Sequence, residues 1–280
     1  MLTALTWLVA VAPATRRGEL IGRTLGVAIA GALFGPVLGA IASKLGTGAT
    51  FTAVAGVSLG VVAWTLATEA PPARGAESLA PLREALHDTS ILTGLWLIGL
   101  PALLFGTATV LVPLRLSDLG LGALAIGAVY LVAAALEAGI SPLVGRLSDQ
   151  RGHRLPLSIG LAASAVGAML LPWPERAAVL AVVAVLSAAA FGFFWAPAMA
   201  MLADSSERRN LDPVLAFALM NLAWAPGQAL GSAAGGAIAR ATTDAVPYLA
   251  LSALCVATLV FIRRSPSGRP ALGTAGRKNT

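Results

Sequence analysis

Charged residues are scarce in this chain. Asp, Glu, Lys and Arg make up only 11% of its 280 residues, whereas 57% of the residues are hydrophobic. A soluble domain needs about a quarter of its residues charged to cover its surface. The scarcity of charge therefore excludes water as the main solvent of this fold and predicts a membrane protein.

Cysteine and histidine are nearly absent as well. Cys255 is the only cysteine, which excludes a disulfide within the chain and a cysteine metal site. His87 and His153 have no partner at metal-ligand spacing, so we expect no metal and no cofactor. The sequence has no nucleotide-binding loop and no paired acids or Ser–His arrangement, which argues against an ATP-driven pump and against an enzyme. Its basic residues lie between apolar runs, so nucleic acid is not an expected partner.

Long apolar runs are what the sequence has instead. A helix needs about 20 apolar residues to cross a hydrocarbon core of about 30 Å. Runs of this kind are too long and continuous for the strands of a membrane barrel, so they predict an all-α polytopic fold. Eight of them occur, at about 20–43, 50–68, 90–113, 121–145, 156–173, 177–203, 213–239 and 246–262.

The segment Met1–Ala14 is apolar but too short to span. A signal peptide begins with positive charge, whereas this segment has no charge before Arg16. We therefore interpret it as the end of a truncated span.

The basic residues predict the orientation of the spans. When the loops are taken alternately, fifteen of the 19 basic residues fall in one set, and the other set holds only Lys44, Arg115, Arg176 and Arg240. The positive-inside rule places the richer set, and the C-terminus with it, in the cytoplasm. The longest cytoplasmic connection is Glu69–Thr89, where leucines at positions 79, 82 and 86 predict a short helix on the membrane surface.

Two runs carry glycines four residues apart on one helix face, which lets another helix approach closely. Since the two runs are six spans apart, their matching faces indicate a parallel repeat of six spans. The face in the first run consists of Gly31, Gly35 and Gly39, with Gly22 nine residues before Gly31 and Pro36 beside Gly35. The face in the seventh run consists of Gly227, Gly231 and Gly235, with Pro226 beside it.

The connection after the fourth run reads GRLSDQRGHR, from Gly145 to Arg154. Its pattern G-x-L-x-D-x-x-G-x-R resembles the loop signature of the major facilitator superfamily, which occurs there between spans two and three and again between spans eight and nine. The first run reads G-x8-G-x3-GP-x2-G and resembles the span-five signature of drug–proton antiporters in that family. It departs from that signature only at the final glycine, which is Ala40 here.

The resemblance implies a major facilitator-type helical bundle with an incomplete N-terminal half and a complete six-helix C-terminal half. Spans one to three would be missing, and the Gly227–Gly235 face would lack its partner, which by resemblance is span two. The implied domains are residues 1–68 (partial span four with spans five and six), 69–89 (central cytoplasmic loop), 90–264 (six-helix half) and 265–280 (cytoplasmic tail).

Glu137 is the only acid far from the end of a run. It precedes Arg146 by nine residues, or roughly 13 Å along a helix, which places it near the membrane midplane. Burial disfavours the charged form of a carboxyl group, and this suits a proton carrier. A structural hydrogen bond to a neighbouring helix, or a protonated acid that faces water, would also explain it.

Polar and aromatic side chains in other runs are candidates for a substrate cavity. Asn221 and Gln228 are seven residues apart on one helix face, with Trp224 between them. They would either contact substrate or join helices through hydrogen bonds. Tyr130 and the cluster Phe191, Phe193, Phe194 and Trp195 are further candidates, for which ordinary helix packing is the alternative.

By resemblance, the loop would close the cytoplasmic side of the transporter. Asp149 would face the helix start near residues 22–25, where free amides and the helix dipole stabilise a carboxylate. Arg146 or Arg154 would bridge it to Asp204 at the end of the sixth run. A solvated tight turn at Gly152 is the alternative.

These expectations converge on a multi-pass protein of the plasma membrane that is not an enzyme. The resemblance implies proton-coupled efflux of a small apolar or amphipathic compound, with the lipid bilayer, substrate and protons as partners. The alternative is a non-functional truncated remnant or a membrane scaffold.

Overall fold

The fold is helical throughout the part of the chain that the computed structural model describes, which is residues 38–39, 41–42, 44–68, 87–194, 197–198, 201–202 and 213–264. No strand occurs within these ranges, and the prediction of an all-α polytopic protein is confirmed. The helices are α3 (Thr47–Ala67), α5 (Thr89–Asp118), α6 (Ala123–Arg151), α7 (Arg154–Leu170), α8 (Ala177–Phe193), α10 (Pro213–Ala241) and α11 (Ala245–Arg264).

Seven of the eight predicted runs coincide with these helices. The first run lies almost entirely outside the described residues, as do the segment 1–14, most of the connection 69–89 and the tail 265–280. Among the described helices, four are long and apolar enough to cross a membrane, namely Thr47–Ala67, Thr89–Asp118, Ala123–Ser141 and Ala245–Arg264. The apolar helices α7 and α8 are shorter, at 17 residues each.

Two helix ends differ from the sequence prediction. α8 ends at Phe193, whereas the run was expected to continue to residue 203. Pro197 explains the early end, because proline has no N–H to donate to the carbonyl of residue 193 and disfavours helical backbone before it. α6 continues past residue 145 to Arg151, so most of the predicted loop is helix.

The connection between α6 and α7 is therefore only two residues long. Gly152 has a φ of 75°, a left-handed value that glycine adopts without steric cost, and His153 follows it directly. The chain reverses here within two residues. The tight turn at Gly152, which was the alternative to a gating loop, is thus present in the fold.

α5 begins at a well-formed cap. The carboxylate of Asp88 accepts hydrogen bonds from the backbone N–H groups of Ser90 at 2.7 Å and Ile91 at 3.3 Å. An Asp in this position satisfies amides that have no partner within the helix. The cap fixes where the long connection ends and the first helix of the bundle begins.

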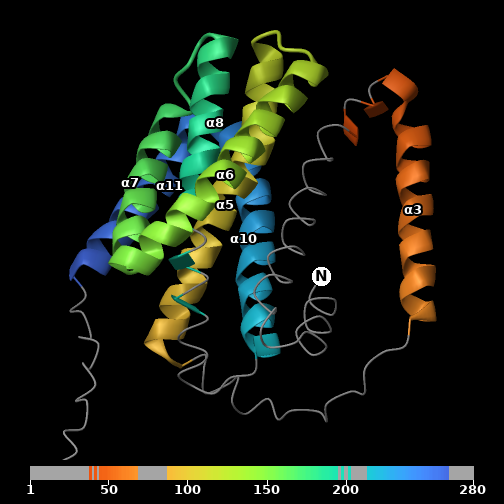
Figure 1. The fold of residues 1–280 in the computed structure, drawn as a ribbon. Coiled ribbons are helices and arrows are strands. Elements are labelled where there is room, and N and C mark those ends of the chain that lie inside the picture. The colour runs from red at the N-terminus through yellow and green to blue at the C-terminus, as the bar shows by residue number, and fades with distance from the viewer. Residues whose placement is uncertain are drawn as a thin grey trace, which may run out of the picture.

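The helices from α5 to α11 form one bundle (Figure 1). α10 packs along α5, α6 packs against α8, and α7 packs against both α8 and α11. α3 stands apart from this bundle in Figure 1, and its large side chains are exposed, for example Trp64 at 76% and Leu66 at 82%. Apolar side chains that face outward in this way are expected where lipid is the solvent.

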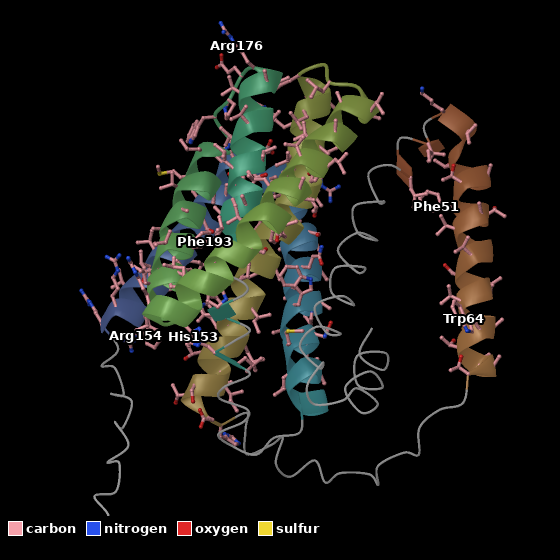
Figure 2. All side chains as sticks on the ribbon, viewed as in Figure 1. Phe51, Trp64, His153, Arg154, Arg176 and Phe193 are labelled. Atoms are coloured by element: carbon pink, nitrogen blue, oxygen red, sulfur yellow. The ribbon has the colours of Figure 1, made fainter. Side chains whose placement is uncertain are left out.

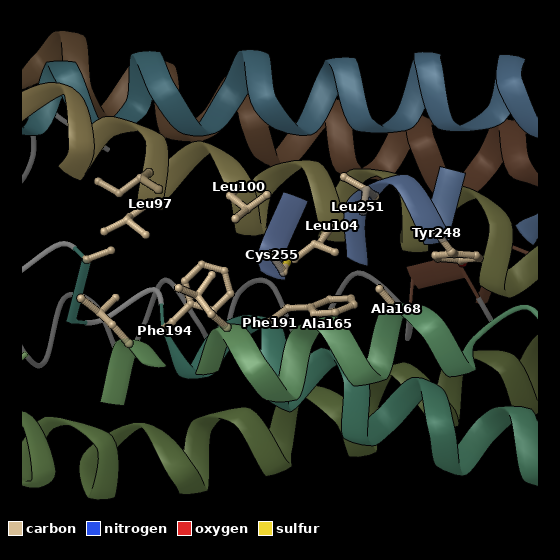
Figure 3. Packing of buried hydrophobic residues seen from close by; sticks show 14 of the residues in the cluster. Leu97, Leu100, Leu104, Ala165, Ala168, Phe191, Phe194, Tyr248, Leu251 and Cys255 are labelled. Carbon is tan, nitrogen blue, oxygen red and sulfur yellow. The ribbon is translucent and has the colours of Figure 1, made fainter. Parts of the chain in front are cut away.

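The interior of the bundle is an apolar cluster (Figure 3). The buried residues include Leu100 and Leu104 of α5, Phe191 of α8 with Phe194 directly after that helix, and Cys255 of α11. The outer faces of the same helices are also apolar, because valines and leucines of α6, α8 and α11 remain exposed. A helix that is apolar on both its inner and outer faces is typical of a membrane span.

The closest helix contact lies between α5 and α10. A Cβ added at Gly227 would lie 2.9 Å from the carbonyl oxygen of Gly99, and one added at Gly231 would lie 2.9 Å from Cα of Leu103. The expectation that this glycine face lacks a partner is therefore wrong. The face packs on α5 of the same half, because that helix also carries small residues at the contact and allows the two backbones to touch.

Side-chain hydroxyls reinforce this contact in both directions. Thr107 Oγ1 on α5 donates to the carbonyl of Gly231 at 3.0 Å, and Ser232 Oγ on α10 donates to the carbonyl of Gly106 at 3.0 Å. Hydrogen bonds of this kind between membrane helices contribute roughly 0.6 kcal/mol each.

Basic residues lie at both ends of the bundle. Figure 2 shows Arg176 at one end, where α8 begins, and His153 and Arg154 near the other, where α7 begins. Loops that were predicted to lie on opposite sides of the membrane thus reach opposite ends of the bundle. Which end faces the cytoplasm stays a prediction.

Candidate functional site

A cavity of about 140 Å³ lies among α5, α6 and α8, with Leu171 after α7 closing one side. Most of its wall is aliphatic or aromatic. The polar side chains on the wall come from Thr109 on α5, Tyr130 and Glu137 on α6, and Ser187 on α8. An apolar pocket with a few polar groups is the usual form of a small-molecule site.

Glu137 is the middle residue of α6, a helix of 29 residues, and its predicted place near the membrane midplane stays a prediction. Its side chain is half-buried and lines the cavity. The carboxylate lies against α8 at Gly192, since a Cβ added there would collide with Oε1 and lie 2.6 Å from Cδ. The carboxyl group is therefore held between two helices, at the edge of an apolar space.

Tyr130 lies two helical turns before Glu137 on the same helix face. Its hydroxyl donates to the backbone carbonyl of Ala108 on α5 at 3.3 Å. This bond connects α6 to α5 beside the cavity. Tyr130 thus has a place on the cavity wall and a packing contact as well.

Aromatic rings form a chain from the cavity toward α10. Phe105 meets Phe191 edge-on, with ring centroids 5.6 Å apart and the planes at 88°. On its other side, Phe105 lies 5.9 Å from the ring of Trp224. Trp224 therefore packs against Phe105, a residue of the cavity wall, but is not itself on that wall.

The two carboxamide candidates lie elsewhere on α10. Asn221 is exposed and Gln228 is half-buried, and neither side chain is on the wall of this cavity. At Gln228 it is the backbone that makes the close contact, against Gly106 of α5. Their role in binding substrate stays a prediction.

The predicted gating residues are only partly described. Gly145, Arg146 and Asp149 have helical backbone near the end of α6, but their side chains lie outside the described part of the structure, as does Asp204. Arg154 is exposed as the first residue of α7. The gate stays a prediction.

The predicted span-five motif lies mostly outside the described residues, including Gly22, Gly31, Gly35 and Pro36. Gly39 is described as helical, with nothing within 4 Å of an added Cβ. Trp195, a cavity candidate, is outside the described residues too.

The contributors to this site that were not predicted include Phe105, Ser187 and Gly192. Ser187 is 2% exposed, and its hydroxyl has no hydrogen-bond partner within the described residues. A hydroxyl or glycine in the middle of an apolar run was the available signal, but it does not reveal which helix lies opposite. No group of three or more His, Cys, Asp and Glu side chains assembles in the described ranges.

The arrangement can bind a small apolar molecule and hold one exchangeable proton beside it.

Comparison with known protein families indicates the class of protein to which this cavity belongs. A sequence model of the Major Facilitator Superfamily matches residues 1–174 and, again, residues 137–280. The first match alone covers more than half of the chain, and the two overlap over residues 137–174, which include the loop signature at 145–154. No curated protein matches the sequence.

Proposed function

Since the chain belongs to the major facilitator superfamily, a family of membrane transporters, we propose that it exports a small apolar or amphipathic compound in exchange for protons. In transporters of this kind, two halves rock about a central site and expose it to either side in turn. The observation that carries the proposal is a single carboxyl group, that of Glu137, on the wall of an apolar cavity.

The cavity wall supports the choice of substrate class. Phe105, Val112, Val129 and Phe191 offer apolar surface, and burying such surface is the main favourable term in binding an apolar molecule. Three hydroxyl groups and one carboxyl group leave few polar partners for a sugar or another strongly hydrated solute. A compound with a large apolar part fits this wall best.

The setting of Glu137 supports coupling to protons. Its neighbours on the cavity wall are Tyr130, Ala133, Ala134 and other uncharged side chains. A carboxyl group in such a place is stable when protonated, and it releases its proton more easily once water enters or a cationic substrate approaches. Export rather than import rests on the resemblance of residues 22–40 to the span-five antiporter signature.

Replacing the carboxyl group tests the proposal. The purified chain is reconstituted in liposomes, and uptake of a fluorescent amphipathic dye such as ethidium is followed with and without an imposed pH gradient. We expect Glu137→Gln to reduce gradient-driven transport to the level of empty liposomes while dye binding persists. The matched control is Glu175→Gln, which alters an exposed acid in the connection between α7 and α8. Gradient-driven transport that is equal in both variants would remove Glu137 from the mechanism.

A further inference from the structure

The side chain of Glu137 occupies a notch on α8 that exists because residue 192 is glycine. A Cβ at this position would collide with Oε1, lie 2.6 Å from Cδ and lie 2.8 Å from Cγ of Glu137. Cβ atoms in folded proteins essentially never approach another heavy atom so closely. Any other residue at 192 therefore forces either the helix or the carboxyl group to move.

α8 cannot move away from α6, because α7 supports it from another side. A Cβ at Gly160 of α7 would lie 2.6 Å from Cβ of Phe194, and one at Gly167 would lie 3.1 Å from Cβ of Ser187. The hydroxyl of Ser164 on α7 also donates to the carbonyl of Ala190 on α8 at 3.0 Å. Close packing of this kind transmits a displacement instead of absorbing it.

The carboxyl group of Glu137, in contrast, is free to move. It is the end of a flexible side chain, and the cavity that Glu137 lines offers space next to the notch. A methyl group at residue 192 would therefore rotate the carboxyl group out of the notch and into the cavity, with little change to the helices.

We propose that Gly192 is a positioning residue for Glu137: its missing side chain seats the carboxyl group against the backbone of α8 and holds it at the wall of the cavity rather than in its interior. The inference rests on the proposed function for its role in transport, but the seat itself is a property of the packing. In the seat, the carboxyl group is shielded by two helices. In the cavity, it would be reached more easily by water and substrate.

Few other charges face this seat. α8 contains no titratable residue, α7 contains only Arg154 at its start, and α5 contains only Arg115 and Asp118 in its last turn. On α6 itself the titratable residues besides Glu137 are Tyr130, Arg146, Asp149 and Arg151. Among the described side chains of this set, only Tyr130 shares the cavity wall with Glu137. A change at Gly192 therefore acts on Glu137 by changing the position and hydration of its carboxyl group, and not by changing a nearby charge.

Infrared difference spectroscopy tests the seat without a transport assay. The carbonyl-stretch band of protonated Glu137 is identified in the purified protein by its loss in Glu137→Gln. We expect Gly192→Ala to shift the frequency of this band, because the carboxyl group would exchange its contact with the α8 backbone for the cavity and its hydrogen bonding would change. The control is Gly139→Ala on α6, where an added Cβ meets nothing within 4 Å.

A second variant separates position from stability. Combining Gly192→Ala with Glu137→Ala removes the three Glu137 atoms nearest the added methyl group, so the melting temperature of this double variant should match that of Glu137→Ala alone. A band that is unchanged in Gly192→Ala would overturn the inference, and so would a shift of equal size in Gly139→Ala. If the band shifts as expected but Glu137→Gln still transports normally along a pH gradient, the seat is correct and the proposed proton coupling is wrong.

Discussion

Phe105 is the residue that joins the cavity to the rest of the bundle. Its ring contacts Phe191 on one side and Trp224 on the other, so it transmits the position of α10 to the cavity wall. Aromatic pairs of this geometry contribute about 0.5–1.5 kcal/mol each beyond their buried area. A change at Phe105 therefore affects both the wall that faces a ligand and the support behind that wall.

We expect Phe105→Ala to weaken binding of an amphipathic dye about tenfold, which corresponds to about 1.4 kcal/mol. Fluorescence titration of the purified protein measures this. Phe193→Ala is the control, because that ring is on α8 but not on the cavity wall. Equal loss of affinity in the two variants would place the dye outside the cavity.

Residues differ in how far the sequence predicts their role. Glu137 was identifiable because a lone acid in an apolar run is costly unless it serves a purpose. Gly192 and Ser187 were not, because their importance depends on the helices opposite, α6 and α7, and helical periodicity does not specify which helices are neighbours. Trp224 packs against Phe105 of the cavity wall, and its predicted contact with substrate stays a prediction.

At the scale of the element, α5 and α10 show how glycine spacing translates into contact. Gly231 has no room for a side chain, since an added Cβ would lie 2.9 Å from Cα and 3.0 Å from the carbonyl carbon of Leu103. Gly236, five residues on, has ordinary space, with Cγ1 of Val110 at 3.5 Å. The two glycines of one helix thus differ in what a methyl group would displace.

Gly231→Ala should therefore lower the stability of the bundle by about 1–3 kcal/mol, because backbone must move to admit the methyl group. Gly236→Ala should leave it nearly unchanged. Thermal unfolding of the two variants in detergent provides the comparison. A melting temperature for Gly231→Ala that equals the wild-type value would contradict the close contact.

The sequence predicted the elements better than their ends and partners. The sequence predicts the glycine face of α10, but the resemblance assigned it to span two rather than to α5, because a repeat pattern does not specify which helix lies opposite. α8 was expected to reach residue 203, since hydropathy stays high there. Pro197 ends the helix for a reason of backbone geometry, which hydropathy does not measure.

At the scale of the whole molecule, the alternation of basic loops agrees with the arrangement of the helices. Arg154 and Arg176 follow one another at successive connections and lie at opposite ends of the bundle. Helices that alternate in this way can all cross one bilayer. The number of spans before residue 38 and the truncated N-terminal half stay predictions.

Labelling in intact cells tests the predicted orientation. In a Cys255→Ala background, we expect His153→Cys to react with a membrane-impermeant maleimide only after the cells are permeabilised, and Glu175→Cys to react before. The positive-inside rule gives this direction, since the loop of Arg151 and Arg154 belongs to the richer set. Reaction of both sites from the same side would refute the topology.

The tight pairing of α5 with α10 also bears on how the cavity can change size. These helices are in backbone contact, whereas α5 meets α6 and α8 mainly through side chains that surround an empty space. The distance between α5 and α10 is therefore hard to change, whereas the distances from α5 to α6 and α8 can change more easily. A ligand too large for this cavity would therefore be accommodated by α5 and α10 moving together, rather than by separation of these two helices.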